Sequence, residues 1–447
     1  MTENDKLRSW LQEHHIEEVE CVLPDLSGVA RGKVMPALKF ADLQVTHLPI
    51  SIFWQTITGD YARFGGEQFY TEADINLVPD LTTLRSVPWA SSPTAQVIHD
   101  AEWQEGGTVE YAPRQVLKRV VGYFEAEGWT PVVAPELEFY LTKPNTDPDY
   151  PIEPPVGRSG RQGAGRQPYS ISAVDEYDKV VDDMYDFAEE QGLEIDTITQ
   201  ESGAAQLEIN LLHGNPVELA DQTFLFKRTI REAAFRNGCY ATFMAKPMEN
   251  QPGSAMHVHQ SVVDKRTGQN IFSDEKGEPT DAFYGFLAGQ QKYLTAAACM
   301  LAPYVNSYRR LVPDAAAPIN LEWGIDNRSA GLRVPVSDAN ARRIENRVAG
   351  ADINPYLAIA ASLACGYLGI KKGLRPRERV SGNAYRSEYD LPRGLKEALG
   401  LFAECDELQG VLGPAFSALY QAVKNEEFEA FMRVISPWER EHLLLSV

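Results

Sequence analysis

Residues 132–142 read VVAPELEFYLT, and within this apolar run Glu136 and Glu138 stand two positions apart. Because successive side chains of a strand point to opposite faces, both carboxylates share one face of a sheet. The same spacing recurs in QLE at 206–208, HVH at 257–259 and RIENR at 343–347. The sequence therefore predicts a sheet with carboxylates, imidazoles and guanidiniums on a single face.

A sheet face with this much charge needs compensating charge in order to fold. A second acidic pair, Glu201 and Glu208, flanks GAA at 203–205, a turn that can return both carboxylates to one place. Taken alone, each glutamate pair is also consistent with a solvated strand face, and the His257–His259 pair with core histidines. Hard divalent cations and a polyphosphate suit the whole mixture best, so we interpret it as a metal–nucleotide site.

Five arginines gather in one segment of the chain: Arg310, Arg328, Arg333, Arg343 and Arg347. Guanidinium groups match carboxylate and phosphate oxygens through paired hydrogen bonds. One or two such residues are ordinarily surface residues, whereas five of them in predicted strands and loops of a core domain indicate an anion site.

Composition limits the class of protein. A chain of 447 residues with 44% hydrophobic residues predicts two domains or one large domain, and a net charge of −21 argues against nucleic acid as the main partner. The five scattered cysteines include no C-x-x-C pair, which fits a reducing cytoplasm. The first residues are polar, so we expect no signal peptide, and the longest apolar run, 356–370, is too short to span a bilayer. We expect a soluble cytoplasmic protein and a buried helix at 356–370.

The chain divides into two predicted parts. Strand-like runs at 19–23, 30–35, 75–78 and 95–98 follow a helix at 3–14 and form a small β-rich domain over residues 1–107. Residues 108–447 alternate predicted strands at 132–141, 206–211, 255–263, 331–336 and 343–348 with helices at 113–128, 173–191, 217–237, 281–302 and 354–373. The Gly- and Arg-rich segment 154–168 is expected to be a loop.

Several strings, taken together and in order, resemble the glutamine synthetase family over nearly the whole chain. They are PELEF at 135–139, ESGAAQLEI at 201–209, ATFMAKPM at 241–248, GSAMHVHQS at 253–261, NSYRRLVP at 306–313, DNRSAGLRVP at 326–335, and RRIENR at 342–347 followed by NPYLA. The resemblance implies an α+β fold: a small N-terminal β-grasp domain and a large catalytic domain with a curved antiparallel half barrel and flanking helices. It also implies stacked rings, such as a dodecamer, with active sites between subunits.

The resemblance also assigns roles to residues. Glu138, Glu201 and Glu208 would hold one Mg²⁺ or Mn²⁺ ion, and Glu136, His257 and Glu345 a second. ATP would contact His259, Ser261, Arg328, Arg333 and Arg343, and glutamate would contact Gly253, Arg310 and Arg347. Arg328, Glu345 and Arg347 would serve catalysis, in which ATP phosphorylates the γ-carboxylate of glutamate and an amine then displaces phosphate.

Two positions depart from the ammonium-using pattern. Ala316 stands where the family's flap has a glutamate, and Phe53 and Trp54 stand where the small domain has an aspartate; Asp314 and Asp60 are the nearby acids that could replace them. Aromatic walls favour a nitrogen nucleophile with a carbon tail, through burial of CH₂ groups or cation–π contacts. That Phe53 and Trp54 are merely core residues remains open.

Our hypothesis is a glutamate–amine ligase that resembles the γ-glutamylpolyamine synthetase branch, which acts on putrescine and related amines in catabolism. Three alternatives stay open: a glutamine synthetase with an unusual flap; a ligase for ethanolamine, a short monoamine or an aromatic amine; and a non-catalytic structural or regulatory homologue. The last is disfavoured because all six expected ligands and all five arginines are present.

Overall fold

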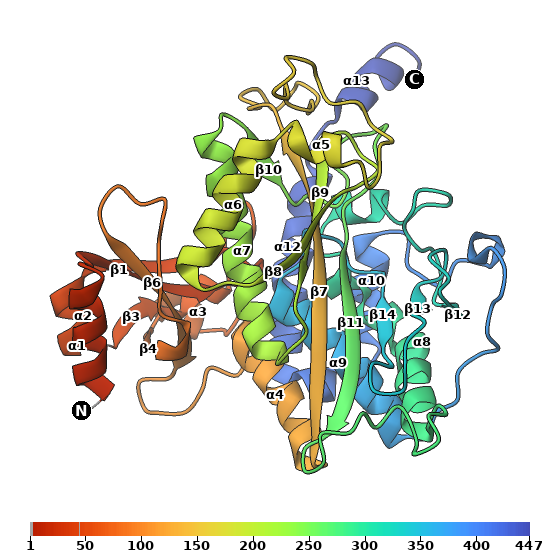
Figure 1. The fold of residues 1–447 in the computed structure, drawn as a ribbon, viewed down its shortest axis with the longest axis horizontal. Coiled ribbons are helices and arrows are strands. Elements are labelled where there is room, and N and C mark those ends of the chain that lie inside the picture. The colour runs from red at the N-terminus through yellow and green to blue at the C-terminus, as the bar shows by residue number, and fades with distance from the viewer. Residues whose placement is uncertain (1–2, 44) are drawn as a thin grey trace.

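Two β-sheets organise the chain (Figure 1). The structure is a computed structural model that describes residues 3–43 and 45–447. A six-stranded sheet is built from residues before 103, and an eight-stranded sheet from residues after 128. The predicted α+β class is confirmed. We keep the domain boundary after residue 107 as a proposal; it falls between the last strand of the first sheet and the helix that follows.

The small sheet has the strand order β2-β1-β6-β4-β3, with β5 paired to β6. Its strands are β1 (Glu18–Pro24), β2 (Ala30–Pro36), β3 (Thr46–Pro49), β4 (Asp74–Pro79), β5 (Arg85–Ser86) and β6 (Thr94–Glu102). Strands β1 and β6 run parallel, and the other pairs are antiparallel. Leu7 of α1 (Glu3–Glu13) and Phe40 of α2 (Ala37–Leu43) pack with Val97 in a core on this sheet.

The large sheet has the order β12-β13-β14-β11-β7-β9-β8, with β10 also paired to β7. Its strands are β7 (Trp129–Thr142), β8 (Ile195–Gln200), β9 (Gln206–Leu211), β10 (Tyr240–Thr242), β11 (Met256–Asp264), β12 (Trp323–Ile325), β13 (Leu332–Val334) and β14 (Ile344–Asn346). All neighbours are antiparallel except β12 and β13. Val133, Leu137 and Phe139 of β7 are buried in the main core, so the alternate residues of β7 face away from it.

Helices cover the apolar side of this sheet and the segments around it (Figure 1). The helices that follow α2 along the whole chain are α3 (Gln68–Thr71), which lies with the small sheet, and α4 (Pro113–Ala126), α5 (Ile171–Asp175), α6 (Asp178–Gln191), α7 (Pro216–Arg236), α8 (Asp281–Leu301), α9 (Pro355–Lys371), α10 (Leu395–Ala403), α11 (Asp406–Leu412), α12 (Pro414–Met432) and α13 (Pro437–Leu443). Short 3₁₀ helices lie at η1 (Ile50–Phe53), η2 (Leu81–Thr83), η3 (Val305–Arg309) and η4 (Ala384–Arg386).

Helix α9 forms the centre of the core, as the apolar run at 356–370 predicts. Asn354 caps its first turn, accepting hydrogen bonds from the backbone N–H groups of Tyr356 and Leu357, and Pro355 occupies the first position. Helix α8 approaches so closely that a Cβ on Gly289 would lie 2.2 Å from the carbonyl oxygen of Cys365. Within residues 3–43 and 45–447, none of the helices combines the length and apolar character that a membrane crossing requires.

A buried arginine joins the small sheet to the helices of the larger part. Arg114 of α4 is 3% exposed and donates hydrogen bonds to Asp80 (2.6 Å), Asp100 (2.9 Å) and both carboxylate oxygens of Asp221 (2.9 and 2.8 Å). The Tyr356 hydroxyl donates a further hydrogen bond to Asp221 at 2.7 Å. One guanidinium therefore neutralises carboxylates from β6, from the residue after β4 and from α7 at the same time.

Replacing Arg114 tests how much this cluster contributes to the free energy of unfolding. Arg114→Met should destabilise the protein by about 3–5 kcal/mol, because three carboxylates then lose a buried counter-charge. The measurement is the midpoint of guanidinium-induced unfolding. Arg375→Met is the matched control, since its ion pair with Asp281 is exposed and such pairs contribute about 0–1 kcal/mol. Equal shifts for both variants would contradict this role of Arg114.

Candidate active site

Strand register aligns the charged residues of the large sheet in three rows. In the antiparallel pairs, directly opposed residues point to the same face. One row pairs Glu138 of β7 with Glu208 of β9; the next contains His257, Glu136 and Asn210; the third contains Arg333, Glu345 and His259. The shared face that the period-two spacing predicts therefore exists, and it extends over five strands.

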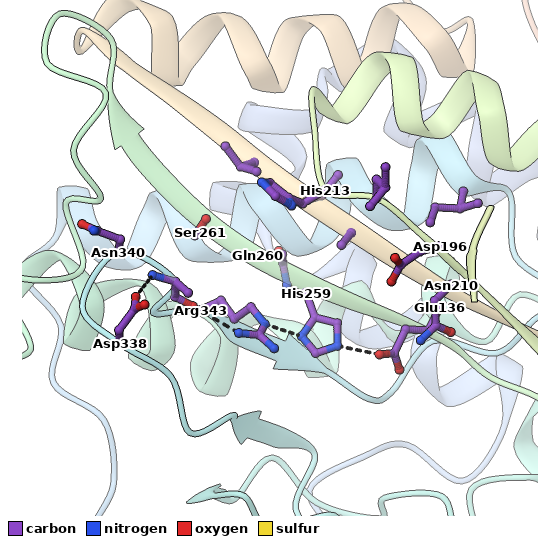
Figure 2. Close-up of a pocket in the computed structure, with 16 residues that line it drawn as sticks. Glu136, Asp196, Asn210, His213, His259, Gln260, Ser261, Asp338, Asn340 and Arg343 are labelled. Atoms are coloured by element: carbon purple, nitrogen blue, oxygen red, sulfur yellow. Dashed lines mark hydrogen bonds and ion pairs between the residues drawn. The ribbon is translucent and has the colours of Figure 1, made fainter. Parts of the chain in front are cut away.

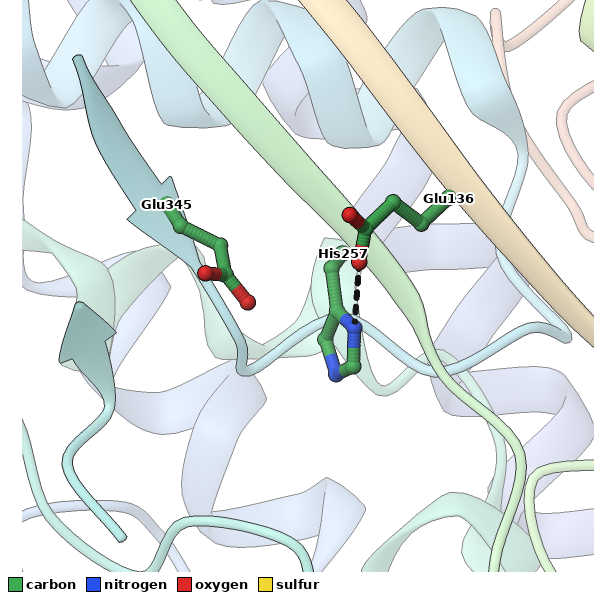
Figure 3. Close-up of side chains that lie close together, drawn as sticks. All are labelled: Glu136, His257 and Glu345. Atoms are coloured by element: carbon green, nitrogen blue, oxygen red, sulfur yellow. Dashed lines mark hydrogen bonds and ion pairs between the residues drawn. The ribbon is translucent and has the colours of Figure 1, made fainter. Parts of the chain in front are cut away.

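Two groups of three side chains on this face could each hold a metal ion. Glu136, His257 and Glu345 each offer one ligand atom, and these atoms all lie within 4.8 Å of one another; the same holds for Glu138, Glu208 and His257. Figure 3 shows the first group, with side chains converging from β7, β11 and β14. Carboxylate oxygens and a neutral imidazole nitrogen are ligands that suit Mg²⁺, Mn²⁺ and similar ions.

Glu201 lies beside the second group rather than in it. It follows the last residue of β8, and its carboxylate accepts a hydrogen bond from the backbone N–H of Ser202 at 3.3 Å. Its charge nevertheless acts on Glu138, and it lines the same cavity as Glu138 and Glu208. His257 thus occupies the place in the triplet that the sequence assigned to Glu201.

Burial and mutual repulsion make two of these carboxyl groups weak acids. Burial and the charge of Glu201 raise the pKa of Glu138 to about 8. Burial and the charges of Glu136 and Glu138 raise the pKa of Glu208 to about 9. With these raised pKa values the two carboxyl groups hold protons at neutral pH, and a dication that bound here would displace them.

The histidines act in the opposite direction on Glu136. Although burial raises the pKa of Glu136, hydrogen bonds from His257 (3.2 Å) and His259 (2.9 Å) outweigh burial and lower it. Arg343 Nε donates to Nδ1 of His259 at 3.2 Å, which assigns the proton of that ring to Nε2, the nitrogen facing Glu136. Figure 2 shows this chain of contacts from Arg343 to Glu136.

His257 is neutral at physiological pH. Burial and the positive charge of Arg347 lower the pKa of His257 to about 4. Its Nδ1 lies against Glu136, so Nε2 can offer its lone pair to an ion.

Glu345 is compensated by arginine. It is fully buried, and Arg333 donates a hydrogen bond to it at 2.6 Å while Arg347 forms a second, shorter contact. Burial raises the pKa of Glu345, but Arg347 and the histidines outweigh this and lower it to about 2. Two arginines predicted to bind substrates, Arg333 for ATP and Arg347 for glutamate, therefore neutralise a predicted metal ligand.

Two adjoining cavities meet at Glu136 and Asn210. The first, here called the inner cavity, has a volume of about 500 Å³. Its lining includes the predicted residues Glu136, Glu138, Glu201, Glu208, Gly253, His257, Arg310, Arg328, Arg333 and Arg347. The second, of about 530 Å³, is lined by the predicted nucleotide residues His259, Ser261 and Arg343 (Figure 2).

Two buried atoms beside these cavities support a polar ligand. Within residues 3–43 and 45–447, Arg347 Nε and Asn210 Oδ1 are buried and have no hydrogen-bond partner. Buried polar atoms are normally paired, so both fit a site that a charged ligand completes. The carboxylates suit divalent ions, and the arginines suit phosphate or carboxylate oxygens.

Arg310 and Gly253 form a tightly packed corner of the inner cavity. Arg310 is 3% exposed and donates to the carbonyl oxygens of Val348 (2.8 Å) and Arg347 (3.0 Å). A Cβ on Gly253 would lie 2.6 Å from Cγ of Arg310, so glycine is required by this close approach.

The predicted amine-binding aromatics do not reach the inner cavity in this chain. Phe53 and Trp54 are 0% and 1% exposed, and the Phe53 ring packs edge-on against Tyr111 at 5.7 Å. Their burial favours the interpretation that they are core residues. Ala316 lines the inner cavity, whereas Asp60 and Asp314 are exposed and do not line it.

Several residues of the inner cavity were not singled out as candidates from the sequence, among them Gln206, Asn210 and Tyr385. Gln206 donates hydrogen bonds to Glu138 (3.3 Å) and to the carbonyl oxygen of Gly253 (3.0 Å). Asn210 follows Gln206 and Glu208 at the same period of two, so the strand pattern could have identified it. Tyr385, from η4, lies in a segment without periodicity, and no such signal marks it.

The chain is similar to known proteins over most of its length. The family model described as "Glutamine synthetase, catalytic domain" matches residues 110–443. Gamma-glutamylputrescine synthetase PuuA of Escherichia coli (strain K12) is 36% identical over 95% of this chain and 91% of its own length. A glutamate–isopropylamine ligase of a Pseudomonas species is 32% identical over 97% and 96%, and a glutamine synthetase of Pyrococcus horikoshii is 32% identical over 94% and 91%.

Solved structures agree over the whole length. A structure titled "GmaS/ADP complex-Conformation 1" superposes with a TM-score of 0.84 and 27% sequence identity, covering 98% of this chain and 99% of the other. The expected fold, with its curved sheet, is thereby confirmed. The chain is an enzyme of the glutamate–amine ligase type, and it belongs to the glutamine synthetase family.

Proposed function

We propose that this enzyme joins the γ-carboxylate of L-glutamate to a polyamine such as putrescine, with ATP as the phosphoryl donor. ATP would transfer its γ-phosphoryl group to the γ-carboxylate, giving ADP and γ-glutamyl phosphate. The amine nitrogen would then attack the acyl carbon, a C–N bond would form, phosphate would leave, and the nitrogen would lose a proton. The observation that carries the choice of amine is Ala316, a small neutral residue lining the inner cavity.

The side chains divide this work by chemistry. Two groups of side chains would each hold a Mg²⁺ or Mn²⁺ ion. The first is Glu136, His257 and Glu345, and the second is Glu138, Glu201 and Glu208. When bound, these ions supply positive charge to the phosphate oxygens. Arg310 and Arg347 would bind glutamate at the corner with Gly253. Arg328, Arg333 and Arg343 would neutralise phosphate oxygens, with His259 and Ser261 along the nucleotide.

Three observations bear on the choice of amine. An ammonium ion has no hydrocarbon and depends on charge and hydrogen bonds, which an alanine side chain does not provide. The names of two similar proteins specify putrescine and isopropylamine as amines. A third is named glutamine synthetase, so ammonium is the candidate to be tested against.

We also propose that the chain acts in the cytoplasm as stacked rings, such as a dodecamer, with active sites between subunits. All five cysteines are free, which suits a reducing compartment. The C-terminal segment exposes large apolar side chains, among them Trp438 (62% exposed), Leu444 (74%) and Leu445 (94%). Helix α13 projects from the body of the molecule (Figure 1). Exposed apolar segments of this kind are typical of interaction sites.

Removing the apolar segment tests the assembly. A chain ending at Ser436 should form smaller particles than the full chain, because it lacks the exposed residues of α13 and the tail. Light scattering gives the particle mass, and circular dichroism shows whether the shortened chain is folded. An unchanged mass in a folded truncated chain would contradict a role for this segment.

Metal binding should depend on pH in a defined direction. The pKa values of Glu138 and Glu208 are raised to about 8 and 9, so below these values a dication must displace their protons. Mn²⁺ affinity, measured by titration calorimetry, should therefore rise between pH 6 and pH 9, by about tenfold per pH unit for each displaced proton. Glu208→Gln should weaken binding and flatten the pH dependence.

Glu194→Gln is the matched control for this measurement. Glu194 is exposed and precedes β8, so its replacement changes the net charge without touching the cavity. It should retain the affinity and the slope of the unmodified enzyme. Mn²⁺ binding that is independent of pH in the unmodified enzyme would show that protons do not occupy the ligand positions.

The amine is tested by ADP release with L-glutamate and a panel of nucleophiles. We expect kcat/KM to be highest for putrescine and at least about tenfold lower for ammonium, since a lost charged contact is worth about 1.5–3 kcal/mol. The panel also includes ethanolamine, propylamine and an aromatic amine. Turnover with ammonium well above every alkylamine would identify a glutamine synthetase, and no ADP release with any nucleophile would identify a non-catalytic homologue.

A further inference from the structure

A third cavity, here called the outer cavity, adjoins the inner one. It has a volume of about 510 Å³. It shares four lining residues with the inner cavity, namely Ser202, Pro252, Ala315 and Ala316. Because the shared wall consists of small side chains, a flexible chain could extend from the reaction centre into the outer cavity.

The lining of the outer cavity is polar. Its remaining residues are Gly165, Arg166, Lys246, Glu249, Asn250, Gln251 and Asp314. Among these described residues no apolar side chain is larger than alanine or proline. An alkyl or aromatic tail would therefore gain little from burial here, whereas a tail with a polar or charged end can keep hydrogen bonds.

The charged side chains of this cavity differ in how freely they can contact a ligand. The Lys246 ammonium is half-buried and already donates a hydrogen bond to the carbonyl oxygen of Gln251. Glu249 and Asp314 are exposed carboxylates on two different segments of the wall, and Arg166 is the other cation. Two carboxylates that can accept hydrogen bonds from a positively charged group are thus present in the lining of the cavity.

Asp314 also influences the inner cavity. Burial raises the pKa of the Tyr385 hydroxyl, Arg347 and Arg310 act against this, and the negative charge of Asp314 adds to the rise. Tyr385 lines the inner cavity and Asp314 lines the outer one. Asp314 therefore stands near the passage between them, although it is not part of the inner wall.

We propose that Asp314 and Glu249 bind the distal ammonium group of a diamine while its other nitrogen reacts in the inner cavity. The outer cavity then selects polyamines over monoamines of the same length. This inference rests on the proposed function and gives Asp314 a role other than that of the missing flap glutamate: it acts on the far end of the substrate.

The test compares two substrates of equal carbon length, putrescine and n-butylamine, which differ only in the distal ammonium group. In the unmodified enzyme, kcat/KM for putrescine should exceed that for butylamine at least about tenfold, as expected for a charged hydrogen bond. Asp314→Asn and Glu249→Gln should each reduce this ratio, and together by about tenfold or more, mainly through the KM for putrescine.

Two further variants keep the test specific. Arg166→Gln removes a cation from the same cavity and should shift the KM for putrescine in the opposite direction. Asp147→Asn removes an exposed carboxylate that lines neither cavity and should leave the ratio unchanged.

The possible results distinguish a failure of the distal-ammonium subsite from a failure of the proposed polyamine ligase activity. If the unmodified enzyme prefers putrescine but Asp314→Asn with Glu249→Gln keeps the ratio, the subsite is wrong and the polyamine ligase stands. If the unmodified enzyme favours butylamine, both the subsite and the polyamine are wrong. If ammonium exceeds every amine, the proposed function itself is overturned.

Discussion

Repulsion among carboxylates held on one rigid sheet face is the constraint on which the rest of the site depends. The register of β7 with β9 and β11 places Glu138 against Glu208 and Glu136 against His257, and the strands cannot move apart. Each carboxylate is therefore compensated in its own way. Raised pKa values keep protons on Glu138 and Glu208. Hydrogen bonds from two imidazoles stabilise the carboxylate of Glu136, and two arginines neutralise the fully buried Glu345 of β14.

This arrangement links the proposed metal ligands to the arginines proposed to bind phosphate and glutamate. In the ligand-free chain Arg333 and Arg347 are bound to Glu345. Glu345 would hold an ion that supplies positive charge in their place, and Arg333 and Arg347 could then contact anionic substrates in the inner cavity. Arg343 and Glu136 also fix the orientation of the His259 ring, which lines the second cavity. Proposed ligands for cations and arginines proposed to bind anions thus lie on one sheet face and contact one another.

The sequence predicted those parts of the structure that follow from local periodicity. Period two identified Glu136, Glu138 and the His257–His259 pair, and the long helices α8 and α9 lie within two residues of their predicted ends. Periodicity is weak over three residues, and β10 and β12 were missed, whereas β13 and β14 lie inside longer predicted runs; β8, with six residues, was missed as well. It also fails beyond a strand end, where Glu201 departs from the triplet, and it cannot tell a core aromatic such as Phe53 from a ligand wall, because that depends on packing between distant segments.

The position of the carboxylates relative to the reacting nitrogen has a chemical consequence. An amine attacks only as the neutral base, and a carboxylate beside it would stabilise the ammonium form and raise its pKa. An ammonium substrate needs such a carboxylate to be bound at all, and the same group must then accept a proton. A diamine separates the two demands. Its distal charge would be held by Asp314 and Glu249, while its reacting end would lie beside Ala316 in place of a flap carboxylate. Moving the negative charge away from the reaction centre therefore preserves both binding and nucleophilicity.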